Sequence, residues 1–221
     1  NIRKWKAMVR EKDSKKKNEL ETYNNVTNGG EFGIEMTMPY AVSVTIEGDC
    51  PIILHGWNSD AVDEKAKAKT GSKVKKTDNL ESYVYRTDNG EIGVPGTYIK
   101  GAIVGGAKYQ QDPRSSRKSA QDLFKAGVVP LTEIASFGTK DWDYVDRRRV
   151  VIKMAAITRE RPAFKTGWRL NYDLQVLVPE YITPQLLYRV LSDAGRLVGI
   201  ADHRPTFGRF NIVQFEVQEQ E

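Results

Sequence analysis

The stretch 94–109 (VPGTYIKGAIVGGAKY) determines how the rest of the chain is interpreted. Pro95 and Gly96 interrupt the segment before it, and Thr97 is of the residue type that caps helix N-termini. Apolar residues then recur at helical spacing: Ile99, Ile103 and Ala107. This pattern predicts a helix over residues 97–109. Small residues that lower helix propensity indicate that another backbone or a ligand passes close to it: Gly101, Ala102, Gly105 and Gly106.

The segments on either side of this helix have the patterns of strands and of a second helix. Residues 41–46 (AVSVTI) are mostly β-branched and predict a strand before the helix. Residues 149–158 (RVVIKMAAIT) and 168–178 (WRLNYDLQVLV) predict two strands after it. A second helix opens with proline at its first position, Pro184. Residues 207–217 (FGRFNIVQFEV) predict the last strand.

The resulting order is strand, helix, strand, strand, helix, strand. It predicts an α+β fold, a ferredoxin-like (RRM-like) β-α-β-β-α-β domain with an antiparallel sheet and both helices on one face. We expect residues 1–38 to form a basic N-terminal arm and residues 39–221 to form this domain. The domain is expected to carry a long insertion at about residues 57–92 and a basic hairpin at about residues 138–168.

The charge of the chain is unevenly distributed. Lys and Arg outnumber Asp and Glu by 34 to 29, a net charge of +5. Residues 1–17 hold eight Lys and Arg but only two Asp and Glu, so the arm carries the basic excess and the remainder is nearly balanced. The arm is either a binding element or a solvated tail. In the domain itself, local clusters matter more than the total.

Several classes of protein are disfavoured by composition. No apolar run approaches the ~18–20 residues that span a bilayer, and no apolar segment follows the basic start, so neither a membrane span nor a secretory signal is expected. One cysteine excludes an intrachain disulfide, and two histidines beside it make a zinc site poor in ligands. A site of Asp and Glu oxygens leaves weaker traces and stays open. We expect no metal and no cofactor.

Three stretches resemble a known family. Residues 94–102 (VPGTYIKGA) are similar to the PG-[ST]-x-x-KG signature that opens the first helix in the RAMP superfamily, the repeat-associated proteins of CRISPR effector complexes. Residues 199–210 (GIADHRPTFGRF) resemble the glycine-rich segment before that family's last strand. The strand that ends at Gly48, followed by residues 51–56 (PIILHG), resembles the family's first strand and turn. The motifs occur in the family's order and cover residues 41–217.

Within that superfamily the chain looks most like the backbone subunits that polymerise along guide RNA. The resemblance implies a non-catalytic subunit that coats guide RNA or single-stranded DNA in a helical oligomer, with other effector-complex subunits as further partners. It also implies a role in antiviral defence in the cytoplasm of a prokaryotic cell or a virus-infected prokaryotic cell. A viral or mobile-element relative that coats RNA or single-stranded DNA would show the same features.

Basic groups near turns and strand ends are the candidate binding residues, because Arg and Lys suit phosphate oxygens and aromatic rings suit stacked bases. In addition, the helix that follows Pro-Gly offers free backbone N–H groups to a phosphate. The candidates are Lys100, Lys108, Arg114, Arg117, Lys118, Arg147, Arg149, Arg159, Arg161, Phe164, Lys165, Trp168, His203, Arg204 and Arg209.

Each candidate also has a structural interpretation. Phe164 and Trp168 are equally suited to core packing, and Arg114 to an ion pair with Asp112. We expect Arg159, Arg161 and Lys165 to be exposed on a projecting tip, so that their replacement by alanine leaves the fold intact. Two other functions remain open. One is an endoribonuclease on the same fold that uses His55, His203 or Asp60, and the other is an assembly protein whose basic arm binds acidic partners.

Overall fold

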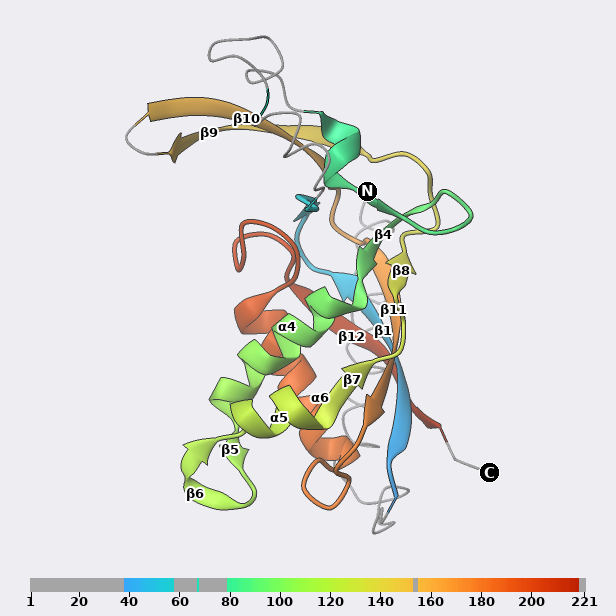
Figure 1. Ribbon diagram of the computed structural model, residues 1–221, viewed down its shortest axis with the longest axis vertical. Coiled ribbons are helices and arrows are strands. Elements are labelled where there is room, and N and C mark those ends of the chain that lie inside the picture. Colours follow the sequence, from blue (N-terminus) through green and yellow to red (C-terminus); the bar gives the residue numbers. More distant parts are fainter. Residues whose placement is uncertain (1–37, 58–66, 68–78, 153–154, 219–221) are drawn as a thin grey trace, which may run out of the picture.

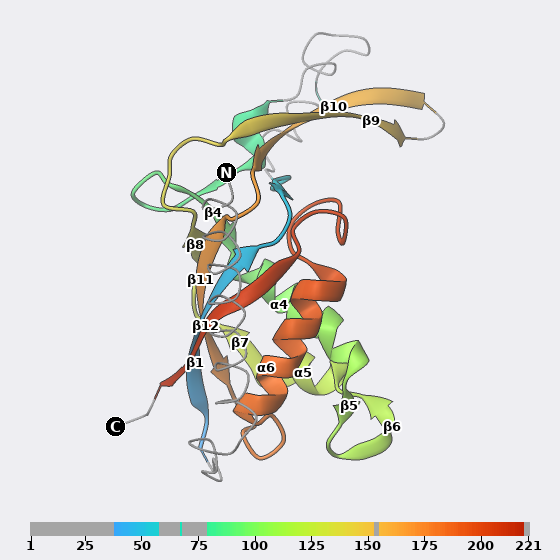
Figure 2. The same ribbon diagram turned by 180° about the vertical axis from the view of Figure 1, so that it is seen from behind.

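The computed structural model describes residues 38–57, 67, 79–152 and 155–218. The main sheet has four strands, all paired antiparallel, in the order β12-β1-β11-β7. They are β1 (Tyr40–Gly48), β7 (Val128–Pro130), β11 (Arg169–Val176) and β12 (Phe210–Gln218). Three helices, α4 (Gly96–Gly106), α5 (Gln121–Gly127) and α6 (Pro184–Asp193), pack on one face of this sheet, as Figures 1 and 2 show from opposite sides. The predicted α+β class is confirmed.

Most of the expected arm and insertion lies outside the described residues. This applies to residues 1–37 of the arm and to residues 58–66 and 68–78 of the insertion. Asp60, a candidate of the endoribonuclease hypothesis, is among them. None of the described helices is both long enough and apolar enough to cross a membrane.

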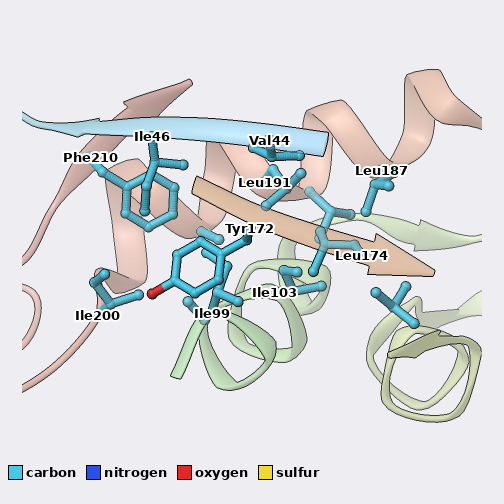
Figure 3. Close-up of a cluster of buried hydrophobic side chains, with 14 of the residues drawn as sticks. Val44, Ile46, Ile99, Ile103, Tyr172, Leu174, Leu187, Leu191, Ile200 and Phe210 are labelled. Atoms are coloured by element: carbon cyan, nitrogen blue, oxygen red, sulfur yellow. The ribbon is translucent and has the colours of Figure 1, made fainter. Parts of the chain in front are cut away.

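The core lies between the main sheet and the helices. Along β1 the side chains alternate between buried and half-buried, because successive residues of a strand point to opposite faces. The buried set of β1 faces the helices: Tyr40, Val42, Val44 and Ile46. Figure 3 shows how Val44 and Ile46 meet side chains from β11, α4 and α6 in one continuous cluster. The alternation therefore fixes which face of the sheet the helices cover.

Two predicted helix starts have different outcomes. Helix α6 begins at Pro184 as predicted, and Thr183 caps it, since its Oγ1 accepts a hydrogen bond from the backbone N–H of Leu186 at 3.2 Å. The cap predicted for Thr97 is wrong. Helix α4 begins one residue earlier, at Gly96, so Pro95 occupies the capping position and no side chain caps the helix. The backbone N–H groups at the start of α4 are therefore left to other partners.

The small residues of α4 serve two different purposes. A Cβ atom placed on Gly106 would lie 2.6 Å from the carbonyl oxygen of Val190, so the missing side chain lets α4 and α6 approach closely. A Cβ atom placed on Gly101 would meet no atom within 4 Å. The predicted close approach of another backbone thus holds at Gly106, while Gly101 faces open space.

Shorter elements connect the main ones. The remaining strands near the ends of the sheet are β2 (Ile52–Ile53), β3 (Tyr85–Arg86), β4 (Ile92–Pro95), β5 (Gln111–Asp112), β6 (Ser115–Ser119) and β8 (Ile134–Ser136). The short helical turns are η1 (Leu80–Tyr83), η2 (Ala107–Tyr109) and η3 (Ala194–Val198). Strands β3 and β4 pair with β8 in a three-stranded sheet, and β5 pairs with β6.

A long hairpin replaces the strand predicted over residues 149–158. The chain forms β9 (Tyr144–Ile152) and then β10 (Ala155–Phe164), which pair antiparallel with Ile152 opposite Ala155. The hairpin projects beyond the main sheet at the upper end of Figure 1. The prediction failed because the β-branched residues at 150–152 and 157–158 look like parts of one strand, and no glycine or proline marks the turn between them. The second strand of the main sheet is instead β7, only three residues long.

Candidate nucleic-acid interface

A pocket of about 270 Å³ lies where the start of α4 meets the segment between η3 and β12. Thr97, Tyr98 and Gly101 line it from α4, and the other lining residues are His55, Ala201, Asp202 and Arg204. A helix start concentrates backbone N–H donors and the positive end of the helix dipole, so it suits an anion. Gly96 N–H donates to Glu133 O at 2.9 Å, and among the described residues no side chain caps α4, so the N–H groups of Thr97 and Tyr98 retain this property at the pocket wall.

The opposite wall is the loop 199–208, which the backbone holds in a fixed path. Gly208 and Ile200 pair through the hydrogen bond from Ile200 N to Gly208 O at 2.8 Å, and Gly208 N donates to Pro51 O at 2.9 Å. A Cβ atom on Gly208 would lie 1.9 Å from the Ile200 oxygen, so only glycine fits. Ala201 and His203 have positive φ angles of 62° and 56°, a conformation that non-glycine residues rarely adopt. Strained backbone of this kind is typical of ligand-binding segments, whose conformation is fixed by their surroundings.

The β9–β10 hairpin is fastened to this loop by two contacts. Arg161 of β10 places its Nε 2.9 Å from Oδ2 of Asp202. The guanidinium of Arg148 in β9 lies over the ring of Phe207, 4.5 Å from its centre, and its Nε and Nη2 donate to Asp146. The hairpin base, the loop and the pocket therefore form one continuous surface.

The strand register assigns the basic residues of the hairpin to two faces. Arg159 is opposite Arg148, and Arg161 is opposite Asp146, so these four residues share the face that meets the loop. Arg147 and Arg149 belong to the other face, where Arg147 forms an ion pair with Glu160 at 3.2 Å. The structure thus brings Arg159 and the previously unselected Arg148 to the pocket side, and it places Arg147 and Arg149 away from it.

The predicted residues of the loop itself lie at the pocket. Arg204 is exposed and lines it, and His203 is exposed on the same turn with its ring 6.4 Å from that of Phe207. Arg209, beyond the loop, places its Nε 3.6 Å from Asp49 Oδ1, and its backbone N–H donates to Cys50 Sγ. Arg209 thus connects β12 to the turn after β1, whereas His203 and Arg204 face solvent.

The aromatic residues predicted to stack on bases are in the core. Phe164 is 4% exposed and stacks on Phe137, with ring centres 4.1 Å apart. Trp168 is 6% exposed, and its indole N–H donates to the carbonyl oxygen of Cys50 at 2.8 Å. The structure supports the packing interpretation of both residues, because neither presents a ring face to solvent.

The prediction that Arg161 is exposed on a projecting tip is wrong. Arg161 is 7% exposed and lies at the base of the hairpin beside Asp202. Of the three residues assigned to the tip, only Lys165 is exposed, and its backbone N–H donates to Asp143 Oδ2 at 2.8 Å. Arg159 is half-buried. The sequence placed these residues in a connection between strands, whereas most of that connection is β10 itself.

Lys100 is bound to backbone carbonyls rather than exposed to a ligand. Its Nζ donates to the carbonyl oxygens of Phe124 at 2.8 Å and Lys125 at 2.9 Å, and also to that of Val128. These carbonyls end α5, where a helix lacks intrahelical donors and favours a cation. Burial lowers the pKa of Lys100. The predicted phosphate ligand is therefore a side chain that completes the end of a neighbouring helix.

The remaining candidates lie at the lower end of Figure 1, around β5 and β6, away from the pocket. Arg114 donates from Nε and Nη2 to both carboxylate oxygens of buried Asp112 and lies 5.6 Å from the Tyr181 ring centre. This pairing lowers the pKa of Asp112 and raises that of Arg114. Lys108, Arg117 and Lys118 are exposed nearby on η2 and β6. The candidates thus separate into two groups at opposite ends of the domain.

Sequence reasoning missed Asp202 and Tyr98 as pocket residues. Asp202 lies in the stretch 199–210 and Tyr98 in the stretch 94–102, but neither was selected as a binding candidate. A carboxylate is an unexpected component of a phosphate site, so no pattern selected it. Among the described residues, no group of three or more His, Cys, Asp or Glu side chains is arranged to hold a metal ion.

Similarity to known proteins is found among solved structures. No protein-family model matches the chain, and no curated protein matches it. Among solved structures, the chain is similar to a chain of the cryo-EM structure of the Type III-B Cmr-beta bound to cognate target RNA, with 10% sequence identity and a TM-score of 0.49. The match covers 89% of this chain and 66% of that chain, so this chain spans just under two thirds of its length.

Proposed function

We propose that this protein binds the backbone of single-stranded nucleic acid across the pocket and the loop-facing side of the hairpin. The observation that carries the proposal is the pocket at the uncapped start of α4, with Arg204 on its wall and the hairpin fastened beside it. Backbone N–H groups and arginine are the donors that proteins use for phosphate oxygens. The pocket is also open at Gly101, which leaves room for a ligand to approach the helix.

The fold supports this proposal through its connectivity. The elements that build the main layer follow one another as β1, α4, β7, β11, α6 and β12, with sheet order β12-β1-β11-β7. We propose that this is a ferredoxin-like arrangement with β9–β10 inserted between β7 and β11. In that arrangement the first helix and the loop before the last strand lie side by side, which places the two RAMP-like segments, 94–102 and 199–210, around one pocket.

The finer proposal concerns what is coated and how. The resemblance of residues 94–102 and 199–210 to RAMP backbone subunits supports guide RNA as the partner, with single-stranded DNA as the other candidate. Copies would line up head to tail along the strand, because heterologous contacts that do not close generate helical arrays. Sedimentation with long RNA tests this, since a chain that stays monomeric on excess RNA does not form such an array.

A matched pair of variants at Gly101 tests the pocket. Gly101→Leu fills the open space above the helix, while Gly101→Ala adds a single methyl group. Both replace a helix-interior glycine, so the melting temperature is expected to hold or rise in each. Affinity for a labelled oligouridine, measured by filter binding, is expected to fall at least tenfold in the leucine variant and to change little in the alanine variant. Equal affinity of both variants would remove the pocket from the interface.

We also propose that binding is not coupled to cleavage. The support for this is the resemblance of residues 94–102 and 199–210 to the backbone subunits of the RAMP superfamily, which implies a non-catalytic subunit. His55, the histidine nearest the pocket in the endoribonuclease hypothesis, lies with its Nδ1 3.7 Å from Asp202 Oδ2. The labelled RNA recovered from the binding reactions is expected to stay intact on a denaturing gel. Shortened products that disappear with His55→Ala would establish the endoribonuclease instead.

A further inference from the structure

Asp202 occupies an unusual position for an acidic residue. Its backbone N–H donates to Ile53 O at 3.1 Å, which fixes the loop against β2. Its Oδ2 lies 2.9 Å from Arg161 Nε and 3.7 Å from His55 Nδ1. The side chain nevertheless remains 29% exposed and lines the pocket. Asp202 therefore contacts the buried Arg161 on one side and lines the open pocket on the other.

The Arg161–Asp202 pair is poorly explained by stability alone. Arg161 is 7% exposed, and within the described part of the chain its Nε and Nη1 have no aligned hydrogen-bond partner. The Nε–Oδ2 distance is short, but its geometry is not that of a hydrogen bond, so the two groups attract mainly as charges. Desolvation makes such a buried pair costly unless additional hydrogen bonds satisfy it. What the pair does achieve is to hold the Asp202 carboxylate in one place at the pocket wall.

A carboxylate at a phosphate-binding site limits which ligand fits. An ionised carboxylate only accepts hydrogen bonds, so it repels a phosphate placed directly against it. It attracts a hydroxyl donor, and the nucleic-acid backbone offers one beside each phosphate only when the sugar is ribose. The pocket holds about 270 Å³, several times the ~30 Å³ that one water occupies in the liquid, so there is room for a sugar next to the phosphate.

We propose that Asp202 accepts a hydrogen bond from a ribose 2′-hydroxyl, and that the pocket thereby selects RNA over DNA. The start of α4 and Arg204 hold the phosphate, Asp202 receives the hydroxyl, and buried Arg161 keeps the carboxylate oriented. This rests on the proposed function and assigns its substrate class. Asp202 is thus a specificity-determining residue, and Arg161 is a positioning residue that acts through it.

The test compares three oligonucleotides of the same sequence and length: oligouridine, oligodeoxyuridine and 2′-O-methyl oligouridine. The last retains an RNA-like sugar but lacks the hydroxyl donor. A hydrogen bond to a charged acceptor discriminates by about tenfold or more, so the wild-type protein is expected to prefer oligouridine by that factor over both others. Asp202→Asn is expected to reduce the preference to about threefold or less, with the affinity for oligodeoxyuridine unchanged or increased because a negative charge is removed.

A double variant keeps the test valid if the single variant does not fold. Asp202→Asn leaves Arg161 without its counter-charge, whereas Asp202→Asn combined with Arg161→Met removes both buried charges. Thermal melting identifies which variant is folded, and the loss of RNA preference is expected in each folded one. Equal wild-type affinity for the three oligonucleotides overturns the ribose assignment, as does an equal weakening of all three in the variants. Failure of the wild-type protein to bind any of them at low salt overturns the proposed function itself.

Discussion

The two ends of the domain both carry basic residues, and only one end arranges them around a binding space. At the upper end, Arg204 lines a pocket that also receives the start of α4, and the hairpin face with Arg148 and Arg159 meets the loop beside it. At the lower end, Arg114 is held by both oxygens of Asp112, and the neighbouring cations are spread over η2 and β6. Near the middle, Lys100 completes the end of α5. Position relative to the pocket separates the two ends, and pairing does not, because Arg148 is itself held by both oxygens of Asp146.

The largest expected effect is a loss of stability at the upper end. Arg161→Ala removes a buried side chain together with the counter-charge of the 29% exposed Asp202, and we expect a loss of about 3 kcal/mol in unfolding free energy. Urea unfolding measures this as a lower midpoint. Arg147→Ala on the other face of β9 is the control, because its ion pair with Glu160 is exposed and contributes little. A midpoint unchanged by Arg161→Ala would show that the pair is not structural.

The next effect concerns a lysine that the sequence assigned to binding. Lys100→Ala removes the donor to carbonyls at the end of α5, and we expect a loss of about 1–3 kcal/mol in unfolding free energy with unchanged RNA affinity. Lys125→Ala, exposed on α5, is the matched control for stability. The interpretation fails if Lys100→Ala weakens RNA binding while the melting temperature is retained.

A smaller effect contrasts the two ends directly in binding. The pair Arg159→Ala and Arg204→Ala is expected to lower affinity for oligouridine about tenfold and to reduce the salt slope by about 0.7 for each lost phosphate contact. The pair Arg117→Ala and Lys118→Ala, at the lower end, is expected to stay within about twofold of wild type. Filter binding across a salt series measures both. If the lower-end pair reduced the affinity as much as the upper-end pair, the two ends would not differ in binding.

The smallest effect is a pH dependence of stability at Lys100. Burial lowers the pKa of Lys100 in the folded state below the ~10.4 of an exposed lysine. Between those two pKa values the unfolded chain binds more protons, so the contribution of Lys100 to stability rises with pH in that alkaline window and is constant below it. Lys100→Met removes this term. The difference in unfolding free energy between wild type and Lys100→Met is therefore expected to grow toward alkaline pH, and a difference that shrinks would contradict the assignment.

Periodic patterns predicted the parts of the fold that bury one face. Strand β1 alternates over its whole length and was predicted as residues 41–46, within its observed bounds, and the start of α6 was predicted from Pro184 at its first position. Strand β7 was missed because three residues are too few for any period to show. A basic hairpin was expected at about residues 138–168, but residues 149–158 were assigned to one strand of the main sheet, because the turn between β9 and β10 lacks the residues that usually mark one. Prediction from local sequence therefore failed for the strands whose position is decided by pairing with distant strands.

The candidate site was predictable in part. His203 and Arg204 were selected because they stand in a glycine-flanked turn, and the structure places that turn at the pocket. Phe164 and Trp168 were selected by their neighbours in sequence, but strand direction turns both rings into the core. Arg148 was passed over in favour of Arg147, since the sequence does not tell which face of β9 meets the loop. Side-chain direction, rather than residue type, separated the correct choices from the others.

The length of the β9–β10 hairpin determines how a force on it reaches the contacts that hold it to the loop. Strands of nine and ten residues reach about 30 Å at ~3.3 Å per residue. Arg161 ties β10 to the loop near the end of that strand, and Arg148 ties β9 to it at mid-length. The part of the hairpin beyond Arg148 extends past both contacts, so a force applied near its tip acts through a long lever arm on the Arg161–Asp202 contact. Whatever presses on the far end of β9–β10 is therefore felt at the pocket wall.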